Sequence, residues 1–171
     1  MNKKTKINLI FIRAFFALFF LAVPAFLQAS TAGEIETLLN SKTISYAQAS
    51  RFVLEAAGVF VTANNEEAFN YAVQQNWLPE NTASGDTARL DHVSLLIMGS
   101  FDIKGGIMYS FFRNSHYAYR ELAYLNIIQS RSDPMMLVSG ENLLLYINRI
   151  LTQQEAQVLA ANRRAENTVL E

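Results

Sequence analysis

The chain has 171 residues, is 51% hydrophobic, and carries 14 basic and 15 acidic residues but no cysteine. The lack of cysteine excludes disulfides, thiol nucleophiles, thiolate metal sites and a lipid-bearing cysteine. Residues 30–171 contain ten dispersed basic residues and fifteen acidic residues. The resulting net charge of about −5 argues against binding to nucleic acid or to an anionic membrane surface.

The amino-terminal segment has the pattern of a secretory signal peptide. An apolar run, Ala14–Leu27, follows four positive charges at Lys3, Lys4, Lys6 and Arg13. The run is shorter than the roughly 20 residues of a membrane-spanning helix. Small residues come next, so we expect cleavage after Ala29 or Ala32.

These features predict a division of the chain into three parts. We expect a signal peptide over residues 1–29, a helical-repeat domain over 30–151 and a C-terminal helix over 152–171. The mature protein is then periplasmic or extracellular, and we expect membrane contact only through the signal segment where it is uncleaved.

Two amphipathic helices are predicted first in the mature chain. In the segment Ser45–Ala57, apolar residues recur with helical spacing, and Ser45 with Gln48 forms a capping box. Gly58 is a natural stop. Asn64 is expected to start the second helix, which ends near Pro79. The stripe of the first helix comprises Ala49, Phe52, Val53, Ala56 and Ala57.

A third helix is predicted over Ala88–Phe101, and a break follows at Lys104-Gly105-Gly106. Adjacent glycines there lack the spacing of a phosphate-binding loop and are better explained by a backbone needing positive φ. A further helix is expected from about His116 to Leu125. The residues of the third helix expected to face inward are Val93, Leu96, Ile97 and Ser100.

The last part of the chain is predicted to form two helices separated by a bend. The first spans Glu141–Leu151 with Ser139 as its cap. A second capping box, Thr152 with Glu155, starts the last helix, which runs to about Val169. Because β-branched runs are too short for a sheet, the expected fold class is all-α, built of stacked helical hairpins.

A shift of 50 residues aligns Ala68–Phe101 with Ala118–Leu151 without a gap. Most matches pair one apolar residue with another, as in Val93 with Leu143 and Ile97 with Ile147. Such self-similarity is typical of helix pairs that bury their apolar stripes against neighbouring pairs. An ancestral repeat and a coincidence between amphipathic helices both explain the alignment.

Two stretches have the layout of a helix, an apolar corner, a polar loop and a capped helix. One runs from Ala68 through Trp77-Leu78-Pro79 to Leu96, and the other from Tyr117 through Ile127-Ile128 to Arg149. This layout resembles surface-layer-homology repeats, which anchor proteins to cell-wall polymers. The family's Thr-Arg-Ala-Glu motif is replaced by Arg89-Leu90-Asp91 and Ser139-Gly140-Glu141, so the resemblance assigns no ligand residues.

A second resemblance covers roughly residues 45–151. The run from Leu95-Leu96-Ile97-Met98 through Lys104-Gly105-Gly106 to Arg120-Glu121-Leu122 is similar to poorly characterised spirochaete envelope proteins. It implies a cell-envelope setting and no reaction.

Aromatic residues are concentrated just after the glycine pair. Aromatic rings beside arginines suit sugar rings or a partner protein, although core packing also explains several of the rings. The candidate binding residues are Tyr109, Arg113, His116, Tyr117 and Arg120. The six aromatics of this stretch are Tyr109, Phe111, Phe112, Tyr117, Tyr119 and Tyr124.

No pattern of reactive residues indicates an enzyme. His92 and His116 are the only histidines, and no third ligand stands at metal spacing, so we expect no metal site and no cofactor. No serine has a nucleophile-elbow pattern. We expect a non-enzymatic envelope protein that binds a wall component or a partner protein. The alternative is a wall hydrolase using paired carboxylates, for which the candidates are Glu66 with Glu67, Glu121 and Glu141.

Overall fold

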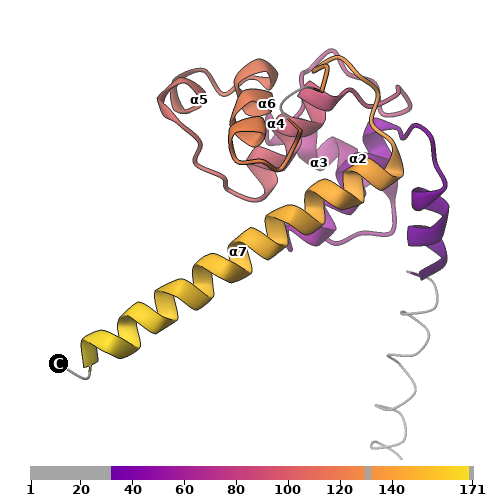
Figure 1. Cartoon of the computed structure of the whole chain (residues 1–171). Coiled ribbons are helices and arrows are strands. Elements are labelled where there is room, and N and C mark those ends of the chain that lie inside the picture. Colours follow the sequence, from indigo (N-terminus) through magenta and orange to yellow (C-terminus); the bar gives the residue numbers. More distant parts are fainter. Residues whose placement is uncertain (1–31, 130–131, 170–171) are drawn as a thin grey trace, which may run out of the picture. The chain divides into compact units, whose positions relative to one another are not determined.

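The computed structural model describes residues 32–129 and 132–169 (Figure 1). The predicted signal peptide and its cleavage after Ala29 lie outside this range. The chain divides into two units, residues 1–39 and 40–171. In the first unit, residues 32–39 are helical.

The second unit is helical, which confirms the all-α prediction. Its described residues contain no strand, only two isolated antiparallel bridges that join Ser45 to Thr87 and Arg89 to Leu137. The helices are α2 (Tyr46–Ala56), α3 (Asn65–Gln74), α4 (Leu90–Ser100), α5 (Ile107–Phe112), α6 (Ser115–Tyr124) and α7 (Gly140–Val169).

Three helices of this unit start next to a closed ring of three backbone hydrogen bonds, formed by Ile44, Ala88 and Val138. The amide of Ile44 donates to the carbonyl of Val138, that of Val138 to Ala88, and that of Ala88 to Ile44, at 2.8–3.1 Å. All three side chains are buried. Because α2, α4 and α7 each begin two residues after their ring residue, the ring sets where they start.

The first two helices begin and end as predicted. Ser45 and Gln48 form the capping box of α2, and the side chain of Asn64 accepts from the amide of Glu66 at the start of α3. The helices α2, α3, α4 and α6 end in the same way: the amide of the residue after a left-handed residue donates to the carbonyl five residues before it. The residue in left-handed conformation at these ends is Gly58, Asn76, Asp102 and Asn126 respectively.

Backbone geometry recurs at the predicted spacing of 50 residues. Asn76 and Asn126 have φ of 58° and 57°, and the caps Asn64 and Asn114 start α3 and α6. Burial recurs at the matched pairs Val93 with Leu143 and Ile97 with Ile147, whose members are all buried. It differs at Leu95, which is buried, and its counterpart Leu145, which is 38% exposed.

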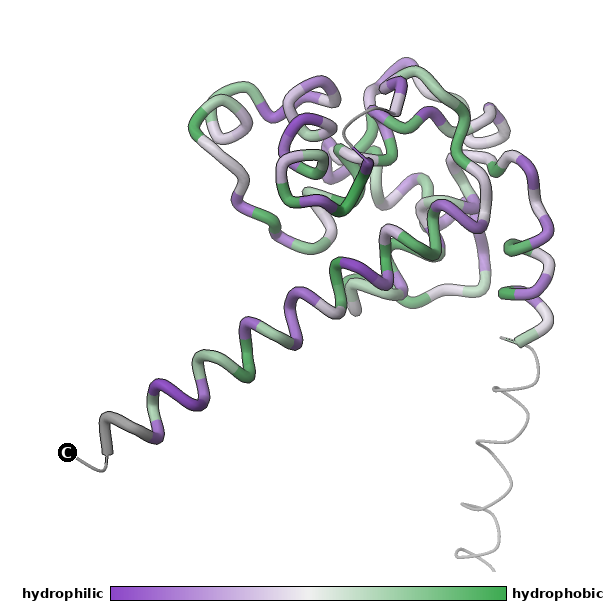
Figure 2. Tube along the Cα trace, in the orientation of Figure 1, coloured by the Kyte–Doolittle hydropathy of each residue, from purple (hydrophilic) through white to green (hydrophobic). Residues whose placement is uncertain are grey.

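Apolar faces of the helices form the core of the second unit, and hydrophobic segments alternate with polar ones along the trace (Figure 2). In α4 all four residues predicted to face inward are buried. In α2, Ala49 and Val53 are buried as expected, but Arg51 and Leu54 are buried while Phe52 is only half-buried. The guanidinium of Arg51 lies 4.6 Å from the ring centre of Phe52.

The predicted break at residue 152 is wrong. The helix α7 is continuous over 30 residues, so Thr152 lies inside it and the proposed domain boundary after residue 151 falls within a helix. At the corresponding positions α2 and α4 end with Gly58 and Asp102 in left-handed conformation. Thr152 is β-branched and avoids that conformation, so the helix continues.

The segment after the glycine break also departs from expectation. The sequence predicted a short aromatic stretch here and no helix before about His116, but residues 107–112 form the six-residue helix α5. Gly105 has φ of +48°, as the predicted break requires. The hydroxyl of Ser110 donates to the carbonyl of Gly106, which holds the first turn of α5.

Candidate functional site

The five predicted binding residues lie on α5, on α6 and at the junction between them. Tyr109 belongs to α5, Arg113 follows its last residue, and the other three lie on α6. The side chain of Asn114 accepts from the amide of Tyr117 and so fixes the start of α6. The five residues are thus close together along the chain, but their side chains do not share one surface.

Tyr109 points into the protein and does not belong to an open patch. It is the buried residue of α5, with 6% of its surface exposed. Burial raises the pKa of its hydroxyl, while the nearby Arg113 acts in the opposite direction. Tyr109 therefore anchors α5 to the protein and exposes little surface to a ligand, and its role as a binding residue stays a prediction.

The first turn of α6 carries a small aromatic cluster. The rings of Phe112 and Tyr117 are stacked with centres 5.7 Å apart, and His116 meets Tyr117 edge-on at 5.3 Å. Phe112 and His116 are exposed, as are Arg113 and Arg120. This cluster, together with the two arginines, is the part of the predicted patch that faces solvent.

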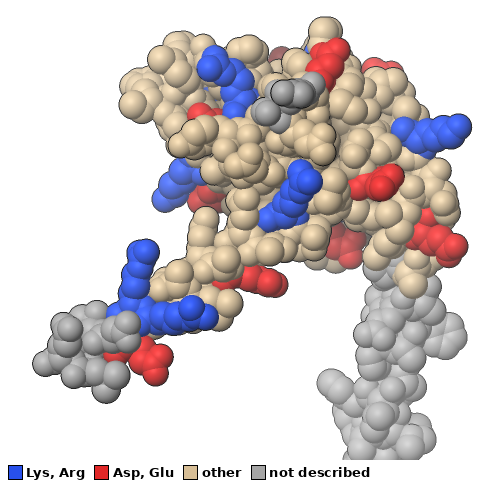
Figure 3. All heavy atoms as spheres, in the orientation of Figure 1, with Lys and Arg blue, Asp and Glu red and all other residues tan. Residues whose placement is uncertain are grey.

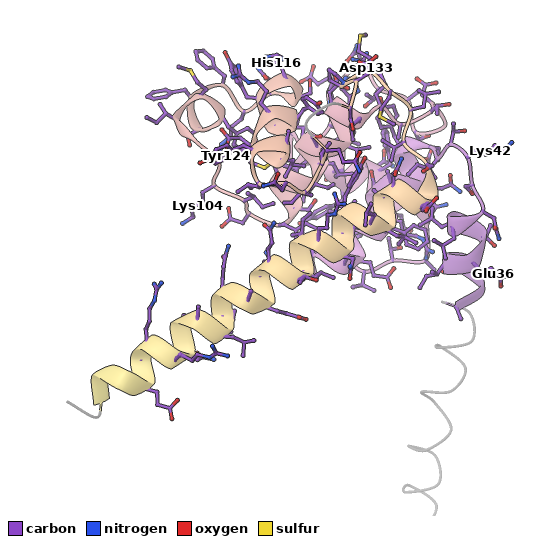
Figure 4. The ribbon with its side chains drawn as sticks, viewed as in Figure 1. Glu36, Lys42, Lys104, His116, Tyr124 and Asp133 are labelled. Carbon is purple, nitrogen blue, oxygen red and sulfur yellow. The ribbon has the colours of Figure 1, made fainter. Side chains whose placement is uncertain are left out.

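A cleft of about 580 Å³ lies at the other end of α6. Figure 4 labels Lys104 and Tyr124, which both line it. Three segments meet there: the loop after α4, the last turn of α6 and the middle of α7. The polar side chains of its lining are Asp102, Lys104, Glu121, Tyr124, Gln153, Gln154 and Gln157.

Glycine allows the carboxylate of Glu121 to lie against the wall of the cleft. A Cβ atom at Gly106 would lie 2.8 Å from Oε1 of Glu121, too close for a larger residue without a shift. Within the same lining, the side-chain amide of Gln153 donates to the carbonyl of Leu125 at 2.9 Å, which ties α7 to the end of α6. The lining therefore carries both hydrogen-bond donors and acceptors.

The carboxylates considered for hydrolysis are not assembled as a set. Glu66 accepts from Ser84 and Glu67 from Thr62, so both have local partners at the start of α3. Glu141 lies in the first turn of α7 and does not line the cleft of Glu121. Over residues 32–129 and 132–169, no group of three or more histidines and acids is placed to hold a metal ion.

Sequence reasoning missed most of this cleft. Of its polar residues, the sequence pointed to Glu121, as a possible hydrolase carboxylate, and to Tyr124, as one of the six aromatics after the glycine pair. Asp102 ends α4 with φ of 48°, an uncommon conformation for a residue other than glycine. The glutamines of α7 were missed because the predicted bend at Thr152 separated them from the helix that brings them here.

A comparison with known proteins yields no match to a family model, a curated protein or a solved structure. The resemblances to surface-layer-homology repeats and to spirochaete envelope proteins stay predictions. Among the described helices, none is both long and apolar enough to cross a membrane.

Proposed function

We propose that this chain is an exported, non-enzymatic protein of the cell envelope, and that its cleft binds a saccharide component of the wall. The composition of residues 1–29 supports export. The observation that carries the proposal is the meeting of carboxylate and amide side chains from three segments around one cleft of about 580 Å³, a volume within the usual range for small-molecule sites.

The chemistry of the lining fits a ligand rich in hydroxyl groups. The carboxylate of Glu121 can accept two hydrogen bonds, and the primary amides of Gln154 and Gln157 can each donate and accept. The ring of Tyr124 is 81% exposed beside these groups and offers an apolar face to a sugar ring.

The test is titration of the full chain with an N-acetylglucosamine tetramer by calorimetry, together with sedimentation on purified wall sacculi. Glu121→Gln should weaken binding by about tenfold or more, because a charge-assisted acceptor is lost. Glu141→Gln is the matched control, since it makes the same change outside the cleft, and it should bind like the wild type. Equal affinity of both variants, or no binding by the wild type, contradicts the proposal.

A wall hydrolase is the second candidate, because two carboxylates, Asp102 and Glu121, line the same cleft. Hydrolysis of a glycosidic bond uses such a pair, one as acid and one as base or nucleophile. Release of reducing ends from sacculi by the wild type, abolished in both Asp102→Asn and Glu121→Gln, would favour this candidate. Binding without release favours the non-enzymatic proposal.

A further inference from the structure

The helix α5 presents an unusually apolar surface to solvent. Of its six residues only Tyr109 is buried. At about 100° per residue, the exposed apolar side chains fall within an arc of about 140°, the arrangement of an amphipathic helix. Their exposed fractions are 73% for Ile107, 55% for Met108, 79% for Phe111 and 61% for Phe112.

Basic residues are concentrated along the segment that carries α5, and the carboxylates of Asp102 and Glu121 lie at its edge. Between residues 103 and 120 the chain has no aspartate or glutamate, but it has three basic residues, all exposed: Lys104, Arg113 and Arg120. In Figure 3 the part of the molecule where Figure 1 places α5 is mostly tan, with both blue and red side chains beside it. The net charge of about −5 beyond residue 29 therefore does not describe this surface.

Two of these cations line one hollow at the side of α5. Lys104 precedes the helix and Arg113 follows it, and both line a depression of about 380 Å³ together with the hydroxyl-bearing Tyr109 and Ser110. Asp102 is the acid of this lining. The hollow lies on the side of α5 that carries Tyr109 and Ser110, and Lys104 and Arg113 flank the helix at its two ends.

We propose that α5 docks on an anionic lipid surface. Its four apolar side chains enter the boundary between head groups and acyl chains, and Lys104 and Arg113 contact the lipid phosphates. The combination of a short apolar helix face with flanking cations is what binding to an anionic bilayer requires. A protein groove would need apolar complementarity but gives no reason for the cations at both ends.

The helix is already formed and held in place, so docking needs little rearrangement. Tyr109 is buried beneath it, Phe112 stacks on Tyr117, and Ser110 bonds back to Gly106. This surface shares Lys104 with the saccharide cleft, but its apolar face belongs to α5, which does not line that cleft. The inference does not depend on the proposed function.

The absence of cysteine allows a local test in the full chain. A Phe111→Cys variant is labelled with the environment-sensitive fluorophore nitrobenzoxadiazole and mixed with vesicles of phosphatidylcholine alone or containing one quarter phosphatidylglycerol. We expect a blue shift and quenching by spin-labelled acyl chains with the anionic vesicles only. Adding Lys104→Gln and Arg113→Gln should weaken this response by about tenfold or more.

A label introduced by Val61→Cys is the matched control, because Val61 is 73% exposed in the loop between α2 and α3. A response of the label at position 61 equal to that at position 111 would mean that the chain is held on vesicles by its amino-terminal segment and not by α5. A vesicle-bound chain whose label at position 111 stays in water overturns the proposal. So does an equal response to uncharged vesicles, or a response at position 111 only on adding a soluble envelope protein.

Discussion

His92 lies where α2 and α4 meet, in surroundings that favour its neutral form. Its Nδ1 lies 2.8 Å from the hydroxyl of Tyr46, which also accepts from the backbone amide of Arg89. The hydroxyl can therefore donate its proton to an unprotonated ring. Burial lowers the pKa of His92; Asp91 partly opposes this effect and Arg89 adds to it.

This environment predicts a pH-dependent stability. Because the pKa of His92 is lower in the folded than in the unfolded protein, the unfolded state takes up the proton first as the pH falls below about 6.5. The contribution of His92 is complete above that pH and is lost below it, with a slope of at most about 1.4 kcal/mol per pH unit. Urea unfolding between about pH 7 and pH 5 measures it.

Replacing His92 should remove this part of the slope. His92→Gln is expected to have a flatter dependence and a lower midpoint at about pH 7, because the hydroxyl of Tyr46 loses its ring partner. The control His116→Asn replaces the other histidine and leaves the Tyr46–His92 pair intact. A wild-type slope in His92→Gln would contradict the assignment.

At the scale of helices, close approach between α4 and the corner after α3 depends on one glycine. A Cβ atom at Gly99 would lie 2.2–2.5 Å from three atoms of the Trp77 indole. Fifty residues further on, the corresponding position is Arg149, whose guanidinium donates to the carbonyl of Ile127. The corner after α3 is therefore packed by the Trp77 ring against Gly99, whereas the corresponding corner after α6 is held by the hydrogen bond from Arg149.

Gly99→Ala should displace the indole and destabilise the protein by about 1–3 kcal/mol, the usual range for overpacking. Trp77 is the only tryptophan, so its emission reports the site directly. We expect a red shift in the folded variant and a lower urea midpoint. Gly85→Ala is the control, since its Cβ would meet nothing within 4 Å. Unchanged emission in Gly99→Ala would show that the ring is not packed there.

Local sequence signals predicted most helix starts. They did not predict the helix α5 or the continuity of α7. Ser45 and Asn64 were recognisable as caps because their side chains bond amides two or three residues away. The helix α5 escaped prediction because six residues show too little periodicity. Thr152 with Glu155 has the pattern of a capping box, but a pattern within a continuing helix carries no stop signal.

The candidate site was predicted in part for the same reason. The aromatic stretch is local in sequence, so His116 and Tyr117 could be placed together on one turn of α6. Nothing local distinguished buried Tyr109 from its exposed neighbours. The cleft joins Asp102 to the glutamines of α7 across about fifty residues, and only the fold brings them together.

At the scale of the whole unit, the three-way ring explains how short helices share one core. Ile44, Ala88 and Val138 are each at most 1% exposed, and α2, α4 and α7 start around this point. Because the ring is formed by backbone groups alone, it tolerates different side chains. This agrees with the different sequences at the starts of α2, α4 and α7. Only α7 extends well beyond this shared region.

The far half of α7 should therefore contribute little to stability. From Gln154 to Glu166 every side chain is exposed, whereas Tyr146, Ile147 and Ile150 are buried. Ending the chain after Gln157 should shift the unfolding free energy by no more than about 0.5 kcal/mol, with a loss of helical circular dichroism. Ending it after Leu145 removes the buried residues and should unfold the protein. A large loss of stability on the first truncation would mean that a second copy or another segment covers this half of α7, because an isolated helix has little stability of its own.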